Sequence, residues 1–323
     1  MIELLAVSGP TTIQDLGRHG QYRYGVGSAG AMDDIALGAG NLLNGNDAGA
    51  AGIEIAIAPL RLRFLAETSF ALTGADADAT LGTRPLLPWS RTTAREGDIL
   101  TVRRITRGAL LYLTVAGGID VPSVLGSRST QLRGEFGGLD GRVLRDGDRL
   151  PCGKPSVPVP ARDLGIEPPE FALARVMDTA DATVLRVVVA GEYEGFDPST
   201  QARFWDAAWK ITPQSNRYGY RLEGPAVLPR SPIEKRSHGI VPGVIQIPPS
   251  GQPIIQVRDA QTSGGYPKIG TVIAADLWRL GQARLGSALR FVRVSYEEAL
   301  AAGDESEAYL SRLKTVLAHY REY

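Results

Sequence analysis

The sequence contains little of what covalent or metal cross-linking requires. Its 323 residues include a single cysteine, Cys152, so no disulfide can form within the chain and a thiolate metal cluster would need several chains. The three histidines, His19, His238 and His319, show no metal-ligand spacing, so we predict no metal site. This sparse cysteine usage fits a reducing cytoplasm, the compartment we expect.

The chain also lacks an excess of charge and lacks long apolar runs. Lys and Arg together number 35, as do Asp and Glu, so the formal net charge is zero. Nucleic-acid and membrane-surface binders usually carry a net positive charge, so we expect no nucleic-acid and no membrane partner. No apolar run reaches the ~18 residues of a membrane span, and residues 1–5 lack the features of a signal peptide. We expect a soluble, unprocessed chain.

Nucleotide-binding motifs are present only in fragments. Residues 25–30 spell G-x-G-x-x-G, but residues 20–24 are polar and aromatic, where a dinucleotide-binding unit needs a buried apolar strand. Lys154 follows a glycine but lacks the upstream glycine of a Walker A loop. We therefore predict that this chain binds no cofactor by itself.

Glycine and proline are abundant, with 38 and 21 residues, and they separate short apolar runs. This pattern indicates a mainly β protein with a few helices. Six prolines between Pro151 and Pro169 divide the predicted strands into two series. The length is about twice that of a usual domain. We expect domains at 1–152 and 183–323, the second ending in a helix, with a Pro-rich connector at 153–182.

The expected elements follow from apolar periodicity. Strands are expected at 3–7, 53–57, 61–65, 70–73, 99–103 and 110–115, and in the second series at 184–189, 226–228, 244–247, 254–257 and 289–294. Helices are expected at 31–43, 199–208, 275–282 and 304–320.

Polar residues are concentrated in five segments between apolar runs, where loops commonly hold binding and catalytic groups. The segments are GPTTIQDLGR at 9–18, AGAMD at 29–33, VAGGIDVPSVLGSRST at 115–130, SNRYGYRLEGP at 215–225 and DAQTSGGYPK at 259–268.

These segments, in this order and over nearly the whole chain, resemble the biotin-dependent carboxyltransferase subunit family, also known as KipA-like, allophanate hydrolase subunit 2-like or the 5-oxoprolinase C subunit. Three motifs depart from the family pattern. Ser-Gly-Ala-Met-Asp appears as AGAMD at 29–33, Asn-Arg-Met-Gly as NRYG at 216–219, and Gln-Thr-Thr-Gly-Gly-Tyr-Pro as QTSGGYP at 261–267. The resemblance implies two cyclophilin-like β-barrel domains, in agreement with the two strand series.

The resemblance also implies a component of an enzyme complex that is inactive alone. The first expectation is the C subunit of an ATP-dependent 5-oxoprolinase, which converts 5-oxoproline to L-glutamate with a KipI-like B subunit and a lactam-utilisation A subunit. One alternative is a carboxyltransferase half-subunit that moves a carboxyl group from carboxybiotin to urea or a related amide. Another is a KipA-like regulator that binds a KipI-like kinase inhibitor. ATP would enter through the partner subunits, and biotin only in the carboxyltransferase alternative.

Three residues are the candidate catalytic groups. Lys268, one of only five lysines, follows a Gly-Gly-Tyr-Pro turn and would bind an anionic or carbonyl oxygen; the alternative is a solvated surface lysine. Tyr266 would supply a hydroxyl or a stacking face; the alternative is a turn tyrosine that packs on the barrel. Arg128, between hydroxyl residues, would bind a carboxylate, although an ion pair with Asp120 or Asp140 remains open.

Twelve more residues from these segments are candidate binding groups for a small amide or lactam substrate. For Asp33, the alternative to substrate binding is a role as the N-cap of a helix. For Arg217 and Arg221, the alternative is an internal ion-pair network. His238, a lone histidine, is left out because such residues are more often structural. The set is Asp33, Ser127, Ser129, Thr130, Asn216, Arg217, Arg221, Asp259, Gln261, Thr262, Gly264 and Gly265.

Overall fold

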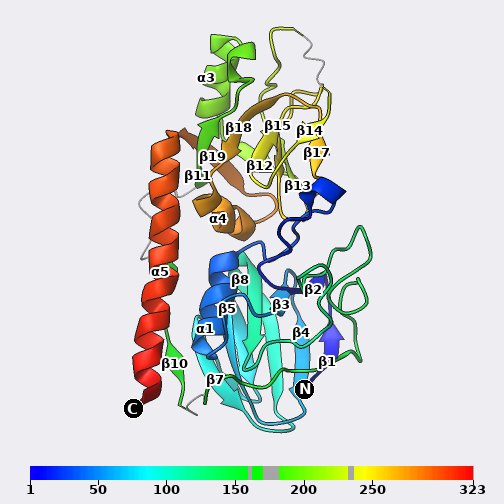
Figure 1. Ribbon diagram of the computed structural model, residues 1–323, viewed down its shortest axis with the longest axis vertical. Coiled ribbons are helices and arrows are strands. Elements are labelled where there is room, and N and C mark those ends of the chain that lie inside the picture. The colour runs from blue at the N-terminus through cyan, green and yellow to red at the C-terminus, as the bar shows by residue number, and fades with distance from the viewer. Residues whose placement is uncertain (159–161, 170–181, 232–235, 323) are drawn as a thin grey trace. The chain divides into compact units, whose positions relative to one another are not determined.

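The computed structural model describes residues 1–158, 162–169, 182–231 and 236–322 (Figure 1). The chain divides into two compact units. Unit 1 consists of Met1–His19, Ala29–Leu173 and Glu307–Tyr323, and unit 2 of Gly20–Ser28 and Ala174–Ser306. Each unit therefore contains a segment from the other half of the sequence. Of the expected connector at 153–182, residues 159–161 and 170–181 lie outside the described residues.

Unit 1 is built on a ten-stranded antiparallel sheet with the order β10-β7-β5-β8-β4-β1-β9, to which β2, β3 and β6 are attached. Its longest strands, β5 and β8, pair along most of their length, with register shifts near the middle of β5. The strands are β1 (Ile2–Val7), β2 (Thr11–Gln14), β3 (Gly52–Ile55), β4 (Leu60–Phe64), β5 (Thr68–Leu81), β6 (Arg84–Pro85), β7 (Ser90–Ala94), β8 (Ile99–Val115), β9 (Arg149–Leu150) and β10 (Leu164–Gly165).

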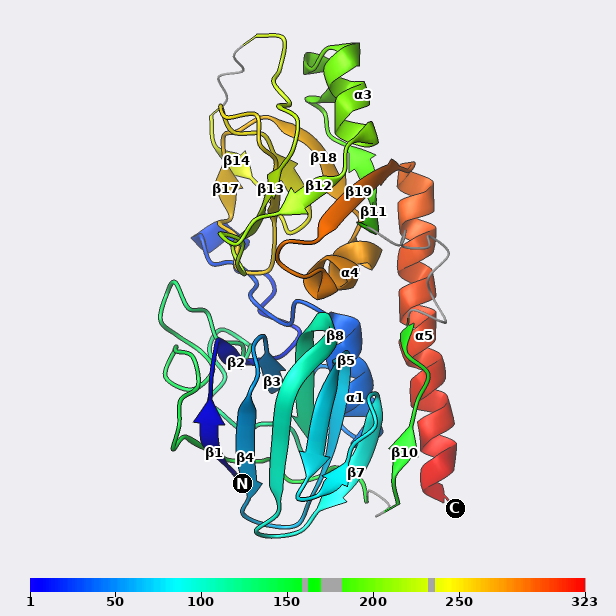
Figure 2. The ribbon, with the colours of Figure 1, turned by 180° about the vertical axis from the view of Figure 1, so that it is seen from behind.

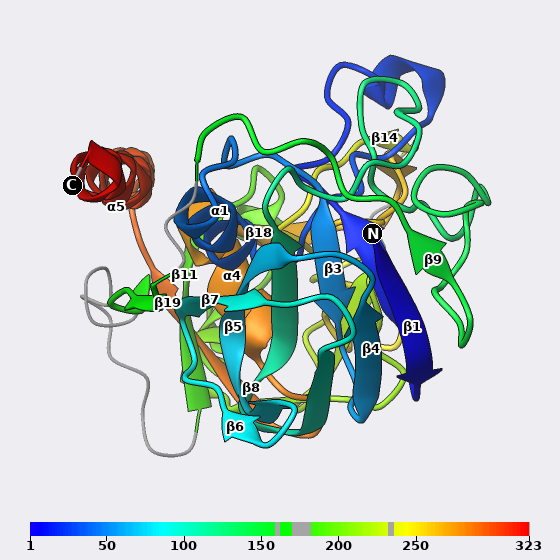
Figure 3. The same ribbon diagram turned by 90° about the horizontal axis from the view of Figure 1, so that it is seen from below.

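Helix α1 (Asp34–Leu43) packs on this sheet against β5 and β8 (Figure 3). Apart from Asp34 and Asn41 its residues are small or apolar, and nine of its ten residues are buried. Gly40 allows the close approach, because a Cβ there would lie 2.8 Å from the hydroxyls of Thr73 and Thr114. The Asp33 carboxylate caps the helix by accepting a hydrogen bond from the Ala36 N–H, at 2.8 Å.

Unit 2 contains a closed barrel with the order β11-β18-β15-β16-β13-β12-β19. The parallel pair β11 and β19 completes the circle, and the remaining pairs are antiparallel. A separate pair of short strands, β14 and β17, lies outside the barrel. The strands are β11 (Ala182–Val189), β12 (Trp209–Ile211), β13 (Gly219–Glu223), β14 (His238–Gly239), β15 (Val244–Gln246), β16 (Ile254–Gln256), β17 (Ser263–Gly264), β18 (Lys268–Val272) and β19 (Ala288–Arg293).

Short helices fill the connections of unit 2. They are η1 (Tyr22–Tyr24), η2 (Tyr193–Gly195), α3 (Pro198–Asp206), η3 (Ala274–Asp276) and α4 (Leu277–Gln282). Helix α3 begins with a proline in its first turn and is capped by the Asp197 carboxylate. Its Phe204 ring stacks on Phe291 of β19 at a centroid distance of 4.9 Å, which anchors the helix to the barrel.

Helix α5 (Tyr296–Glu322) contributes to both units. In unit 2, Ala302 joins a small cluster with Ile273 and Ala275. In unit 1, Leu317 packs with Leu42 of α1, and Figure 2 shows β10 running beside the C-terminal part of α5. No described helix is both long and apolar enough to cross a bilayer.

The expected fold class is confirmed, because strands predominate and the second strand series closes into a barrel. The strands expected at 99–103 and 110–115 are parts of one strand, β8. The strand expected at 226–228 is wrong: Val227 is buried, but its N–H donates to the carbonyl of Gly251 in an irregular connection. The C-terminal helix begins at Tyr296 instead of 304.

Candidate functional site

The Gly-Gly-Tyr-Pro turn (residues 264–267) borders a pocket of about 1210 Å³ in unit 2. Four of the sequence candidates line it: Gln261, Gly264, Gly265 and Tyr266. The Tyr266 side chain is half exposed there, so its ring and hydroxyl are available to a ligand. The remaining lining residues are Ser263, Pro267 and residues from 228–231, 236–237 and 247–249. Thr262 lies within the same segment and accepts the Ile240 N–H with its carbonyl, at 3.0 Å.

Lys268 follows this turn as the first residue of β18, and its side chain is only 8% exposed. Its Nζ donates to the Tyr266 carbonyl at 3.0 Å and lies 4.0 Å from Glu192 Oε1. The alternative of a solvated surface lysine is therefore wrong. A buried ammonium requires nearby oxygens. The Tyr266 carbonyl belongs to a residue that lines the pocket, whereas Lys268 and Glu192 are not among the lining residues.

Glu192 and His238 complete what we call the Lys268 cluster. The His238 Nε2 lies 3.9 Å from the same Glu192 oxygen, and its backbone pairs with Gly264 of the pocket wall. Sequence reasoning missed Glu192, and it set His238 aside. Glu192 and His238 belong to none of the five polar segments. The fold brings Glu192 next to both His238 and Lys268 from a distant part of the sequence.

A buried amide also lies against the turn. Gln246 of β15 is paired in register with Lys268, and its Oε1 accepts from Gln256 Nε2 at 3.0 Å. Its Nε2 has no hydrogen-bond partner among the described residues. A Cβ on Gly264 would lie 2.4 Å from this nitrogen, so a side chain at position 264 would have to displace the buried Gln246 amide.

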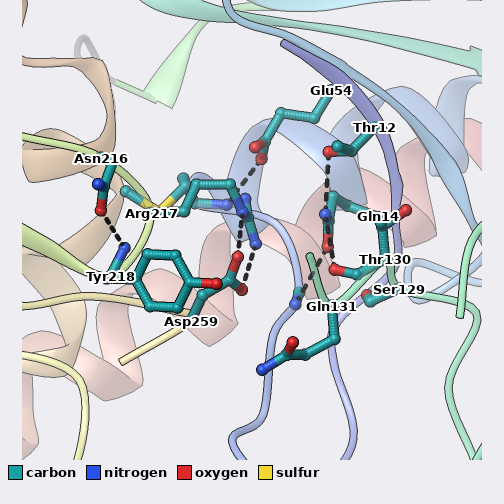
Figure 4. Close-up of polar contacts among 12 residues, drawn as sticks. Thr12, Gln14, Glu54, Ser129, Thr130, Gln131, Asn216, Arg217, Tyr218 and Asp259 are labelled. Carbon is teal, nitrogen blue, oxygen red and sulfur yellow. Dashed lines mark hydrogen bonds and ion pairs between the residues drawn. The ribbon is translucent and has the colours of Figure 1, made fainter. Parts of the chain in front are cut away.

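Arg217 and Asp259 form a two-pronged ion pair, with nitrogen–oxygen distances of 2.9 and 3.0 Å (Figure 4). The Asp259 side chain is fully buried, and its backbone N–H donates to the Arg217 carbonyl at 2.8 Å. Next to them, Asn216 Oδ1 accepts the Tyr218 N–H at 2.8 Å. These contacts match the internal ion-pair alternative and connect Arg217 to the segment that follows β16.

Arg221 lies apart from this pair. Along β13 it is exposed between the buried Tyr220 and Leu222, so its side chain is on the outer face of the barrel. Asn216 and Arg221 instead line a second pocket of unit 2, of about 950 Å³. The substrate-binding roles of both residues remain predictions.

In unit 1, the candidates at 127–130 surround a carboxylate that sequence reasoning did not select. Asp15 accepts hydrogen bonds from Ser127 Oγ at 2.7 Å, Ser129 Oγ at 2.5 Å and the Arg128 N–H at 2.6 Å. The Thr130 hydroxyl donates to the Ile13 carbonyl at 3.1 Å. The hydroxyls are thus engaged in joining this segment to the end of β2.

The Arg128 guanidinium is bound by the protein itself. It donates to the Val121 carbonyl at 2.8 Å and to Asp120 Oδ1 at 2.9 Å, and its side chain is 42% exposed. The ion pair with Asp120 is one of the structural alternatives that the sequence left open. A catalytic role for Arg128 remains a prediction.

Asp33 belongs to a buried network with Glu54 and Tyr112. The Tyr112 hydroxyl donates to Glu54 Oε2 at 2.6 Å and accepts the Asp33 N–H at 2.8 Å. The Met32 N–H donates to the same Glu54 oxygen at 2.9 Å. Burial, and then the negative charges of Glu54 and Asp33, raise the pKa of Tyr112 well above its ordinary value. The network anchors the AGAMD segment, whose Ala29 has a φ of 51°.

Gln14 holds the same segment from the other side (Figure 4). Its Oε1 accepts the Gly30 N–H at 3.2 Å, and its Nε2 donates to Thr12 Oγ1 at 2.9 Å. Gly30 has a φ of 94°, and a Cβ there would lie 2.9 Å from the Gly17 nitrogen. These residues are therefore scaffolding for the segment. No three or more His, Cys, Asp or Glu residues within the described ranges are grouped to hold a metal ion.

Comparison with known proteins identifies the family. The model of the carboxyltransferase domain, subdomain A and B, matches residues 24–293. The chain belongs to this carboxyltransferase family. It is 42% identical to the 5-oxoprolinase C subunit of Escherichia coli (strain K12), with 97% of each chain covered. It is 38% identical to the 5-oxoprolinase C subunit of Haemophilus influenzae, over 98% of this chain and 99% of the relative.

Solved carboxyltransferase relatives have the same fold. The crystal structure of the K. lactis urea amidolyase matches 97% of this chain with a TM-score of 0.86 and 30% identity. The Kluyveromyces lactis urea carboxylase matches the same share with a TM-score of 0.87 and 29% identity. This chain spans only 20% and 29% of those two longer chains.

Proposed function

We propose that this chain is the C subunit of a 5-oxoprolinase, which opens the lactam of 5-oxoproline to L-glutamate with consumption of ATP. The observation that carries the proposal is the similarity to two 5-oxoprolinase C subunits over at least 97% of both chains. The proposed partners are a KipI-like B subunit and a lactam-utilisation A subunit.

The pocket at the Gly-Gly-Tyr-Pro turn offers groups suited to such a substrate. 5-Oxoproline carries a carboxylate and a lactam carbonyl. The oxygens of both groups accept hydrogen bonds from N–H donors and are stabilised by a nearby cation. In this proposal the Lys268 ammonium binds one of these groups, and Gly264 and Gly265 allow close approach of the substrate to the backbone. Tyr266 contributes its hydroxyl or its ring at the rim.

The proposal is tested by reconstitution. The purified chain is mixed with a KipI-like and a lactam-utilisation protein from the same source, and glutamate release from 5-oxoproline is measured with and without ATP. We expect release only from the complete, ATP-containing mixture. A complete mixture without activity would overturn the proposal.

A second candidate function is supported by the urea amidolyase relatives. The chain is 32% identical to urea amidolyase of Lachancea kluyveri over 97% of its own length, although it spans 18% of that protein. In this alternative the chain transfers a carboxyl group from carboxybiotin to urea or a related amide. Fixation of labelled bicarbonate into urea, in a mixture with a biotin carboxylase and a biotin carrier, distinguishes it from the first.

A further inference from the structure

Glu192 lies on the connection between β11 and α3, in a part of the sequence that contains no candidate site residue. Its side chain is only 9% exposed, and one oxygen, Oε1, faces both Lys268 Nζ at 4.0 Å and His238 Nε2 at 3.9 Å. Two ionisable side chains from separate segments, Lys268 and His238, therefore meet at the Glu192 carboxylate.

We propose that Glu192 is a positioning residue for Lys268: its carboxylate keeps the buried amine protonated and holds it beside the Gly-Gly-Tyr-Pro turn. Removal of an ammonium from water is costly unless an opposite charge offsets the loss of hydration. Glu192 supplies that charge, and the Tyr266 carbonyl, at 3.0 Å from Nζ, fixes the amine from a second side. The inference rests on the proposed role of Lys268 in 5-oxoproline turnover.

His238 links this carboxylate to the pocket wall. Its ring Nδ1 lies 3.2 Å from the Arg236 carbonyl, and its backbone pairs with Gly264. The ring is thus held between an oxygen of its own segment and Glu192. The carboxylate therefore lies beside the strand pair that includes Gly264 of the turn before Lys268.

The first test measures the Lys268 amine directly, without reference to catalysis. The full-length chain is treated with limiting acetic anhydride at pH 8, and acylation of Lys268 is quantified by peptide mass spectrometry. In Glu192→Gln, loss of the negative charge favours the neutral, reactive amine, so we expect acylation about 3- to 10-fold faster. Glu194→Gln, which changes an exposed carboxylate two residues along the same turn, is the matched control and leaves the rate unchanged.

Glu192→Asp is the second variant, because it retains the charge and is the less disruptive change. We expect its acylation rate to lie between those of wild type and Glu192→Gln. Circular dichroism establishes that each variant is folded. If folded Glu192→Gln acylates no faster than Glu194→Gln, the proposal is overturned; if Glu192→Gln does not fold, an unchanged rate in folded Glu192→Asp overturns it instead.

The second test uses the reconstituted complex. We expect Glu192→Gln to lower kcat/KM for 5-oxoproline about tenfold and to narrow the pH profile on its alkaline side, with partial rescue by Glu192→Asp. If acylation changes as expected while Glu192→Gln and Lys268→Ala both retain wild-type turnover, Glu192 does position Lys268, and the catalytic role proposed for Lys268 is the part that fails.

Discussion

At the scale of single residues, two candidate cations are held in different ways. Lys268 is buried, and its partners include a backbone carbonyl and a carboxylate 4.0 Å away. Arg128 is 42% exposed and makes a direct ion pair with Asp120. Exposed pairs of this kind contribute little to stability, whereas a cation in a dry site contributes strongly to binding of a charged group.

We predict that Lys268→Ala lowers turnover of the reconstituted complex about 30- to 1000-fold, because a preorganised cation is lost from the site. Arg128→Ala is the comparison. The sequence-based prediction gives it a similar loss, whereas the observed ion pair predicts a stability change under about 1 kcal/mol and no loss of turnover. Each variant is assayed beside its own thermal melt. An activity loss that merely follows melting temperature would indicate a structural role.

We predict that Tyr112→Phe lowers the free energy of unfolding by about 1 to 3 kcal/mol, because Glu54 loses a donor and the Asp33 N–H loses its acceptor inside unit 1. Urea denaturation provides the measurement. Tyr24→Phe, at a side chain that is 65% exposed, is the control and should match wild type. Equal stability of the two variants would contradict the importance of the buried network.

The Arg142–Asp148 pair predicts a pH dependence. Hydrogen bonds from Arg142, at 2.8 and 2.9 Å, are the main cause of a lowered Asp148 pKa. A carboxyl with a depressed folded pKa contributes stability above its unfolded value, near 3.9, and this contribution is lost as the pH falls through the folded pKa. We therefore expect Asp148→Asn to melt below wild type at pH 7 and the difference to shrink below about pH 4. A difference independent of pH from 7 to 3 would contradict the assignment.

At the scale of elements, helix α5 is anchored by few residues. Leu317 is 3% exposed in a cluster with Leu42 and Leu43, whereas Val316 next to it is 46% exposed. We predict that Leu317→Ala costs about 2 to 5 kcal/mol of unfolding free energy, since it leaves a cavity. Val316→Ala is the matched control and should cost under about 0.5 kcal/mol. Urea denaturation measures the free energy of unfolding of both variants. Equal losses of stability would show that Leu317 does not anchor the helix.

The same elements show how far sequence patterns carry. Short apolar runs predicted most strands, but the middle of β8 was missed because Arg104 and Arg107 interrupt the alternation; there they face Asp78 and Asp76 of β5 in the sheet register. The start of α5 was missed because residues 296–301 are exposed or only partly buried, so no apolar stripe marks its first turn. Apolar periodicity in a sequence reflects the burial of one face of a helix or strand. The signal is weak where little of that face is buried.

For the site, the sequence supplied segments but not their partners. The turn at 264–267 does border a pocket, because a contiguous motif stays together in the fold. Glu192, Tyr112 and Gln246 lie on other strands and turns, and only long-range pairing brings them to the motifs. A pattern within one segment carries no information on such contacts.

At the scale of the whole molecule, the G-x-G-x-x-G fragment lies in an irregular segment and is not preceded by a strand: residues 22–24 form a 3-10 turn. We predict that the isolated chain binds ATP and NAD more weakly than a Kd of about 10 μM, roughly 7 kcal/mol of binding free energy. Isothermal titration calorimetry is the measurement. Tighter binding of either nucleotide would show that a nucleotide site exists without either motif.

We also predict that the purified chain alone releases no glutamate from 5-oxoproline, with or without ATP, since a site completed by partner subunits cannot exclude water or orient its substrate by itself. The activity should appear on addition of the other subunits. Turnover by the single chain would show that its site is self-contained.

The division of the chain has a consequence for cleavage. Residues 20–28 belong to unit 2 although they precede most of unit 1, and residues 307–323 belong to unit 1 although they follow unit 2. A single cut between 170 and 181 would therefore not separate two independent domains. The N-terminal fragment would contain residues 20–28 of unit 2, and the C-terminal fragment would contain residues 307–323 of unit 1. The cleaved protein should therefore migrate as one species until it is denatured. Neither fragment expressed alone should be fully folded.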